Sequence, residues 1–151
     1  MIKIYESSFA AIAAILNGKF PSITNVYLNK LPAEFTRPGF LVRLIKGCSE
    51  DCSRDQYRNK ITWQLVYYSP QDQEGDIDLT DQLSIAARLQ QELMDIMTLT
   101  APDGTQYHIF NLAIELRDNE LYCLLDLETL NTRAEIQYDL MQNIYNDYKE
   151  G

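Results

Sequence analysis

Apolar and polar side chains alternate from Tyr57 to Tyr67. The odd-numbered positions are mostly apolar, and the even-numbered positions between them are mostly polar. The apolar set is Tyr57, Ile61, Trp63, Leu65 and Tyr67, and the polar set is Arg58, Lys60, Thr62 and Gln64. Successive side chains of a strand point to opposite faces, so this segment predicts a strand with one buried face and one solvated face. Such half-buried strands are typical of antiparallel sheets, and the alternation places Trp63 in the core.

A second strand is predicted just before this one, at Phe40–Lys46, where branched and aromatic residues predominate. The ten residues between the two strands, Gly47–Gln56, are polar and too numerous for a tight turn. We therefore expect Gly47–Gln56 to form a loop that projects from the two strands.

A hairpin is predicted in the second half of the chain. Tyr107–Leu116 alternates again, and one face would carry its larger apolar side chains, which are Phe110, Leu112 and Ile114. Arg117–Glu120 is polar and turns the chain, and Leu121–Leu127 returns as the partner strand.

Three helices are predicted from apolar residues that recur at three- and four-residue steps. The first, Tyr5–Lys19, ends at Asn17-Gly18 and Pro21, and its buried residues would be Phe9, Ile12, Ala13, Leu16 and Phe20. The second, Thr80–Met97, has a wider stripe, consisting of Leu83, Ala86, Ala87, Leu93 and Met97 with Ile85, Leu89 and Ile96 beside them. The third, Arg133–Tyr148, carries Ile136, Leu140, Ile144 and Tyr148.

This order of elements predicts an α+β fold. Strands that pair as hairpins, with helices between the pairs, favour a mainly antiparallel sheet of about four or five strands with helices packed on one face. The length of 151 residues suits one domain, 1–151, with a C-terminal helix within 131–151. That helix could pack on the same domain or extend to a partner.

The charge is acidic and unevenly distributed. The formal net charge is -9, which argues against unspecific binding of DNA or RNA because such binding relies on lysine and arginine. Residues 1–75 hold nine basic and seven acidic side chains, whereas residues 76–151 hold four basic and fifteen acidic ones. The asymmetry can mark a chain whose halves face different surroundings, but we favour the simpler interpretation of an acidic half that is solvated.

The sequence favours a soluble protein that folds in a reducing compartment. No stretch reaches the roughly 18 apolar residues of a membrane span. The first residues lack the pattern of a signal peptide, since Glu6 comes early and no small-residue cleavage site follows. The three cysteines are an odd number, so they cannot form a complete disulfide framework.

Candidate residues for catalysis or metal binding are few. His108 is the only histidine, and a Ser–His–Asp or Cys–His system would have to use it, but no nucleophile motif accompanies it. Cys48 and Cys52 are separated by three residues rather than two, and a zinc site would need Cys123 and His108 as further ligands from a distant hairpin. Because metal-ligand spacings are usually strict, we assign no catalytic, cofactor-binding or metal-binding residue.

A run of alternating carboxylates precedes the second helix. Asp72, Glu74, Asp76 and Asp78 have the spacing of a calcium loop, but the glycine and glutamate that an EF-hand needs are absent. Carboxylates in this place are favoured by the partly positive N-terminus of the helix. We therefore interpret them as helix-terminal residues and predict no metal ion there.

Several segments resemble a known family. They read Phe-Pro-Ser-Ile at residues 20–23, Phe-Thr-Arg-Pro-Gly-Phe-Leu-Val-Arg-Leu at 35–44 and Ile-Thr-Trp-Gln-Leu-Val-Tyr-Tyr-Ser-Pro at 61–70. An acidic linker, a helix and a two-strand hairpin follow. Over about Tyr5 to Glu128 the chain is similar to the small tail terminator proteins of tailed phages, prophages and phage tail-like particles. The Arg37-Pro38-Gly39-Phe40 entry to one strand and the Tyr-Tyr-Ser-Pro exit from the next carry most of the likeness.

This resemblance implies a structural protein and not an enzyme, with a fold related to tail tube and head–tail joining proteins. Terminators of this kind form a ring, usually a hexamer, on the head-proximal end of the tail tube. They stop polymerisation of the tube and offer a docking surface to the neck proteins. The implied partners are other copies of the chain, the tail tube protein, neck connector proteins and, in contractile tails, the sheath.

The resemblance also gives expectations for single regions. DNA would only pass through the ring, so the acidic second half of the chain is expected to line the channel and repel phosphates. The protein would be made in the bacterial cytoplasm and reside in the virion tail, with no membrane partner. The alternatives are a head-completion or neck protein of related fold and, in another class, a small thiol or metal enzyme that uses the cysteines or His108.

Overall fold

The computed structural model describes residues 3–133, which contain two helices and six strands. The elements in chain order are α1 (Ile4–Lys19), β1 (Asn25–Leu28), β2 (Gly39–Asp51), β3 (Gln56–Tyr68), α2 (Leu79–Ile96), β4 (Thr98–Thr100), β5 (Gln106–Arg117) and β6 (Glu120–Thr132). The predicted helix at Arg133–Tyr148 lies, after its first residue, outside the described residues, while Asn131 and Thr132 belong to β6.

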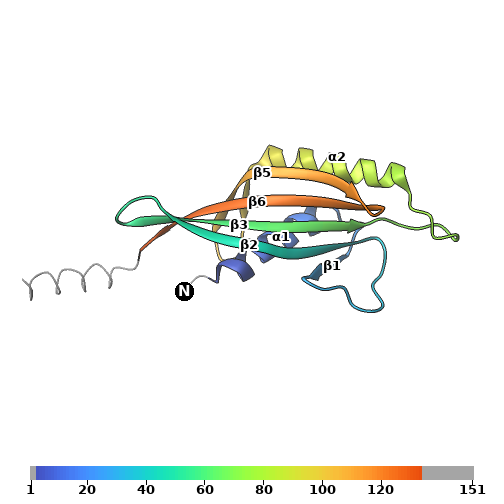
Figure 1. Ribbon diagram of the computed structural model, residues 1–151, viewed down its shortest axis with the longest axis horizontal. Coiled ribbons are helices and arrows are strands. Elements are labelled where there is room, and N and C mark those ends of the chain that lie inside the picture. Colours follow the sequence, from blue (N-terminus) through green and yellow to red (C-terminus); the bar gives the residue numbers. More distant parts are fainter. Residues whose placement is uncertain (1–2, 134–151) are drawn as a thin grey trace, which may run out of the picture.

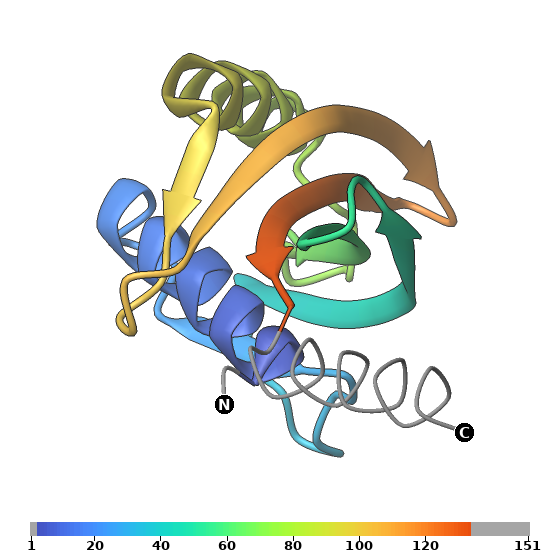
Figure 2. The same cartoon turned by 90° about the vertical axis from the view of Figure 1, so that its left-hand side faces the viewer.

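All six strands form one curled sheet in the order β1-β2-β3-β6-β5-β4 (Figures 1 and 2). β1 pairs with β2 in parallel, and the other four neighbouring pairs are antiparallel. The predicted α+β class is confirmed. The prediction of a mainly antiparallel sheet of four or five strands is wrong, because the sheet is mixed and has six strands. β1 and β4, with four and three residues, are too short for alternation to reveal them.

Both helices pack on one face of the sheet, which we call the helix face (Figure 2). The hydrophobic core lies between the helices and the sheet. It includes Ile12 and Leu16 of α1, Leu89 of α2, and Leu65 and Leu125 of the sheet. Trp63 is 2% exposed, so its predicted place in the core is confirmed. Its indole Nε1 donates a hydrogen bond to Ser8 Oγ at 3.0 Å, which connects β3 to α1.

The buried stripe of α2 differs in part from the predicted one. Ile85, Leu89 and Leu93 are buried as expected, but Leu83, Ala87 and Met97 are exposed. The polar Gln82 takes the fourth buried position, because its side-chain amide is satisfied by the Asn119 carbonyl at 2.7 Å. Among the described residues, no helix is long and apolar enough to cross a membrane.

A β-bulge divides β5 into two parts. Before the bulge the odd-numbered side chains face the core, and after it the even-numbered ones do. The register with β6 shifts between Ile109 and Asn111, so Tyr107 and Ile109 are buried before the bulge, and Leu112 and Ile114 pack on the core after it. The predicted grouping of Phe110 with Leu112 and Ile114 is therefore wrong. Phe110 is the extra residue and is 43% exposed on the face opposite the helices, beneath the Lys60 ammonium at 5.7 Å from its ring centroid.

The segment Gly47–Gln56 is not a loop. β2 continues to Asp51 and β3 begins at Gln56, so only residues 52–55 connect the two strands. The resulting hairpin extends past α1 at one end of the molecule (Figure 1), and we call residues 46–60 the arm. Every residue of β2 from Arg43 to Asp51 is exposed. Because neither face of this part of the strand is buried, its residues need not alternate between apolar and polar. Its sequence therefore resembles that of a loop.

Candidate functional site

The two segments that carry the family resemblance meet through Arg37. Arg37 Nη1 donates to the Ser69 carbonyl at 3.0 Å, and Nη2 donates to Glu120 Oε1 at 2.8 Å. The guanidinium lies 5.4 Å from the ring centroids of both Phe35 and Tyr68. The entry to β2, the exit from β3 and the start of β6 are thus fixed to one another by one side chain.

The ion pair of Arg37 and Glu120 is largely removed from solvent. Their side chains are 20% and 13% exposed, and Glu120 Oε2 is buried with no hydrogen-bond partner among residues 3–133. A carboxylate in such a place is tolerated because the planar guanidinium pairs with it directly. Arg37 therefore ties the connector between β1 and β2 to the ends of β3 and β6.

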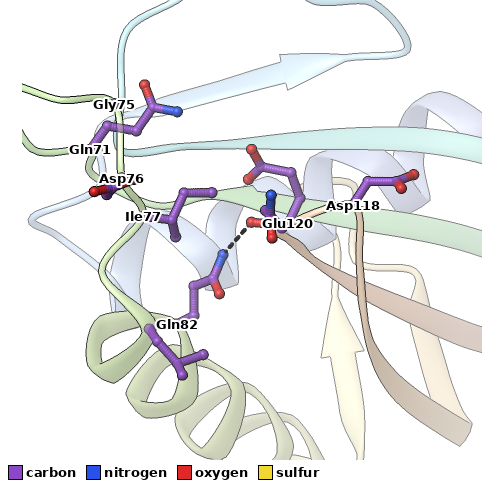
Figure 3. A pocket seen from close by; sticks show the side chains of 9 residues that line it. Gln71, Gly75, Asp76, Ile77, Gln82, Asp118 and Glu120 are labelled. Atoms are coloured by element: carbon purple, nitrogen blue, oxygen red, sulfur yellow. Dashed lines mark hydrogen bonds between the residues drawn. The ribbon is translucent and has the colours of Figure 1, made fainter.

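A shallow groove of about 580 Å³ opens beside Glu120, between the acidic segment before α2 and the β5–β6 turn (Figure 3). Its floor is bridged by the hydrogen bond from Gln82 Nε2 to the Asn119 carbonyl (Figure 3). The lining residues are Gln71, Gly75, Asp76, Ile77, Leu79, Gln82, Asp118, Asn119 and Glu120. Three of these are acidic and none is basic, so the groove suits a basic or neutral polar partner.

The acidic segment itself folds as a turn and a helix cap. The Asp72 carboxylate accepts hydrogen bonds from the backbone N–H groups of Glu74 and Asp76, at 2.9 and 2.8 Å. These three carboxylates lie within 4.8 Å of one another and are exposed. The Asp78 carboxylate accepts from the Asp81 N–H at 3.1 Å and caps α2, which confirms the helix-terminal interpretation for Asp78.

Asp81, in the first turn of α2, also accepts a short hydrogen bond from the Tyr67 hydroxyl, at 2.6 Å. Burial of the phenol, followed by this hydrogen bond and the charge of Asp81, raises the pKa of Tyr67 far above its ordinary value of 10. Burial likewise raises the pKa of Tyr68. Both tyrosines stay protonated at physiological pH, and the first of them ties α2 to β3.

The arm lies at the end of the molecule opposite the groove (Figure 1). Two ion pairs lie along it: Lys60 Nζ lies 3.2 Å from Glu50, and Arg58 Nε lies 3.6 Å from Glu128 of β6. Arg133 holds the arm's tip: it forms an ion pair with Asp51, and its backbone N–H bonds the Asp55 carbonyl at 2.7 Å. The arm is thus a two-stranded projection supported by β6 as far as its tip.

Comparison with known proteins identifies the family. The family model described as "Phage tail terminator protein" matches residues 9–139 of the 151-residue chain. This chain belongs to the phage tail terminator family. The match contains both the Arg37 segment and the β3 exit, so the resemblance seen in the sequence is confirmed. No match was found among curated proteins.

Membership of the tail terminator family indicates a structural component of a phage tail, made to bind other components of the tail or head. The residues considered for catalysis or zinc lie apart in this terminator. Cys48 and Cys52 are exposed on the arm, whereas Cys123 is fully buried in the core, where burial raises the pKa of its thiol to about 12. Within residues 3–133 no cluster of metal-ligand side chains includes a cysteine or His108.

The ion pair of Arg37 with Glu120 is the feature that sequence reasoning missed. Arg37 belongs to a recognised segment, but its partner follows 83 positions later in what was interpreted only as a turn. The one signal in the sequence is that Arg37 directly precedes Pro38 at the entry to a strand. That pattern shows a fixed backbone and does not show which carboxylate the side chain reaches.

Proposed function

We propose that this tail terminator assembles into a ring, of six subunits by analogy with its family, and caps the head-proximal end of the tail tube. The ring stops addition of further tube subunits and presents a docking surface to neck proteins. Its partners are other copies of the chain, the tail tube protein, the neck connectors and, in a contractile tail, the sheath.

The arm is the observation that carries this proposal. It is a rigid two-stranded hairpin with exposed side chains, supported by β6 and held at its tip by Arg133. The segment before α2 and the β5–β6 turn, which line the acidic groove, lie at the other end of the elongated molecule (Figure 1). A closed ring needs two different patches on each subunit, and a molecule whose two ends differ in shape and charge offers them.

The channel of the ring is proposed to be acidic. The carboxylates after residue 75 outnumber the basic side chains by fifteen to four, and they include the exposed Asp118 of the β5–β6 turn. An acidic wall repels DNA phosphates and allows the DNA to pass without binding.

Shortening the arm tests the capping role. Residues 49–59 are replaced by Asn-Gly, which joins Cys48 to its register partner Lys60 through a two-residue turn. None of the removed residues is buried, so circular dichroism and thermal melting are expected to show a folded protein. Negative-stain images of purified tail tubes are expected to show rings with the intact protein and bare, still-growing tube ends with the shortened one.

The matched control is Cys48→Ser/Cys52→Ser, which keeps the length of the arm and removes its thiols. This variant is expected to cap tubes like the original. Normal capping by the shortened protein contradicts the role of the arm. Labelled protein found against the portal and absent from tube ends contradicts the terminator role in favour of a neck protein.

A further inference from the structure

β5 has an outer edge that is mostly unpaired. β4 covers only Gln106–His108, and one further bond joins the Ile109 N–H to the Met97 carbonyl at 2.7 Å. From Asn111 to Arg117, no other strand of the described chain pairs with this edge. Unpaired edges of this length are usually blocked in stable monomers because they can pair with another chain.

The β5–β6 turn defines which backbone groups are free. Asp118 and Asn119 both have positive φ, and they form a two-residue hairpin turn between the paired residues Arg117 and Glu120. Along the two strands, residue pairs that are hydrogen-bonded to each other alternate with pairs that are not, starting with the hydrogen-bonded pair Arg117–Glu120 next to the turn. The N–H and C=O groups of Leu112, Ile114 and Leu116 therefore point away from β6, and among residues 3–133 no hydrogen bond reaches them.

The side chains on this part of β5 are also incompletely covered. Leu112 and Ile114 are only partly buried although they pack on the core, and Leu116 is 48% exposed. A strand that presents both free backbone groups and bare aliphatic side chains is the usual acceptor for an added strand.

The arm carries the second unpaired edge. β1 pairs with β2 only as far as Val42, and the Asn29 side chain then accepts the Leu44 N–H at 3.2 Å. After the bulge that follows Leu44, alternation leaves the backbone groups of Gly47, Ser49 and Asp51 pointing away from β3. The Cys52 N–H bonds the Gln56 carbonyl at 3.2 Å, which agrees with this alternation.

We infer that the arm edge of one subunit adds to the β5 edge of the next, so that the sheet continues across the subunit interface. The inference rests on the proposed ring and names the surface that builds it. On each edge, the backbone N–H and C=O groups of three residues, two positions apart, point outward. The two edges lie on opposite sides of the central β3–β6 pair, so a contact between them joins two different patches and repeats from subunit to subunit.

Charge favours a second copy of this chain as the occupant. Residues 70–81 and 115–120, around the free end of β5, hold eight acidic side chains and one basic one. Residues 43–60 hold five basic and three acidic side chains. Opposite net charges on the two surfaces steer the arm toward β5 and disfavour pairing of two β5 edges.

Leu116→Pro tests the backbone contact, with Leu116→Ala as its matched control. Both variants lose the exposed side chain, but only proline removes an outward N–H, and neither touches the ladder to β6. We expect Leu116→Pro to raise the concentration needed for ring formation by at least about tenfold relative to Leu116→Ala, measured by sedimentation velocity with and without tail tubes. Equal ring formation by the two variants contradicts strand addition.

Disulfide cross-linking tests the same contact between the arm and β5 if the proline variant does not fold. In a Cys52→Ser background, Asn111→Cys, Ala113→Cys and Glu115→Cys each place a thiol on the side of β5 that faces the same way as Cys48 on the arm. Oxidised rings of at least one variant are expected to show a ladder of linked subunits, which disappears with Cys48→Ser. Rings without any link contradict the inference and leave the proposed function intact, whereas absence of rings from the original protein on tubes contradicts the proposed function itself.

Discussion

At the scale of single residues, buried polar contacts position the aromatic side chains of the core. The Trp63 indole donates a hydrogen bond to Ser8 and so joins β3 to α1. The Tyr67 hydroxyl donates one to Asp81 and joins β3 to α2. Apolar burial alone does not specify such an arrangement, because many packings bury similar areas. Each hydrogen bond adds a directional requirement that one arrangement satisfies.

Tyr67→Phe is predicted to lower the free energy of unfolding by about 1.5–3 kcal/mol at pH 7, the range for a hydrogen bond to a charged group. The loss is expected to shrink above pH 10. The pKa of Tyr67 is raised in the folded protein and is about 10 when unfolded, so the original protein loses stability as its unfolded phenol ionises. Phenylalanine has no such ionisation. Urea denaturation of both proteins at pH 7, 9 and 10.5 measures the difference, and a constant difference contradicts the prediction.

At the scale of elements, helices and strands with one buried face could be predicted from the sequence, and fully exposed ones could not. α1 and β3 are half-buried along their length, and their periodicity predicted them with nearly correct boundaries. The returning strand was predicted only as far as Leu127, whereas β6 continues to Thr132. The arm half of β2 has no buried face, so nothing in its residue pattern separates it from a loop. The bulge in β5 was equally hidden, since one extra residue reverses the alternation and no single residue type marks the place.

Arg37→Ala is predicted to lower the free energy of unfolding by about 3 kcal/mol, because it leaves the Glu120 carboxylate largely buried without a counter-charge. The double variant Arg37→Ala/Glu120→Gln is expected to be more stable than the sum of the two single changes allows, since it leaves no buried charge. Guanidinium denaturation of the four proteins gives the coupling energy. Additive effects of the two changes contradict the interpretation of this contact as a desolvated pair.

At the scale of the whole molecule, the sequence predicted the family and the fold class but not how the parts meet. The two recognised segments were noticed separately, and only the folded chain places Arg37 against Ser69 and Glu120. Contacts between positions so far apart leave no periodic pattern in one sequence. The same reason explains why a catalytic or zinc arrangement of cysteines and His108 could be considered at all before their places in the fold were known.

A cryo-electron microscopy map of capped tubes is predicted to show aspartate and glutamate along the inner wall of the ring. These side chains are expected to come mainly from residues after 75, because the excess of acidic residues lies there. In the proposed ring DNA moves through the channel, and a wall of basic side chains would hold its phosphates. A map with lysine and arginine dominating that wall contradicts the proposed channel.

Gly47 has a mechanical consequence for the arm. It lies on the helix face of the arm, directly under the Tyr5 ring, and any Cβ there would collide with the Tyr5 hydroxyl. The first turn of α1 therefore supports one face of the hairpin, and within residues 3–133 no helix packs on its other face. A load on the hairpin is therefore expected to meet more resistance toward α1 than away from it, so that in the proposed ring each copy would flex mainly in one direction.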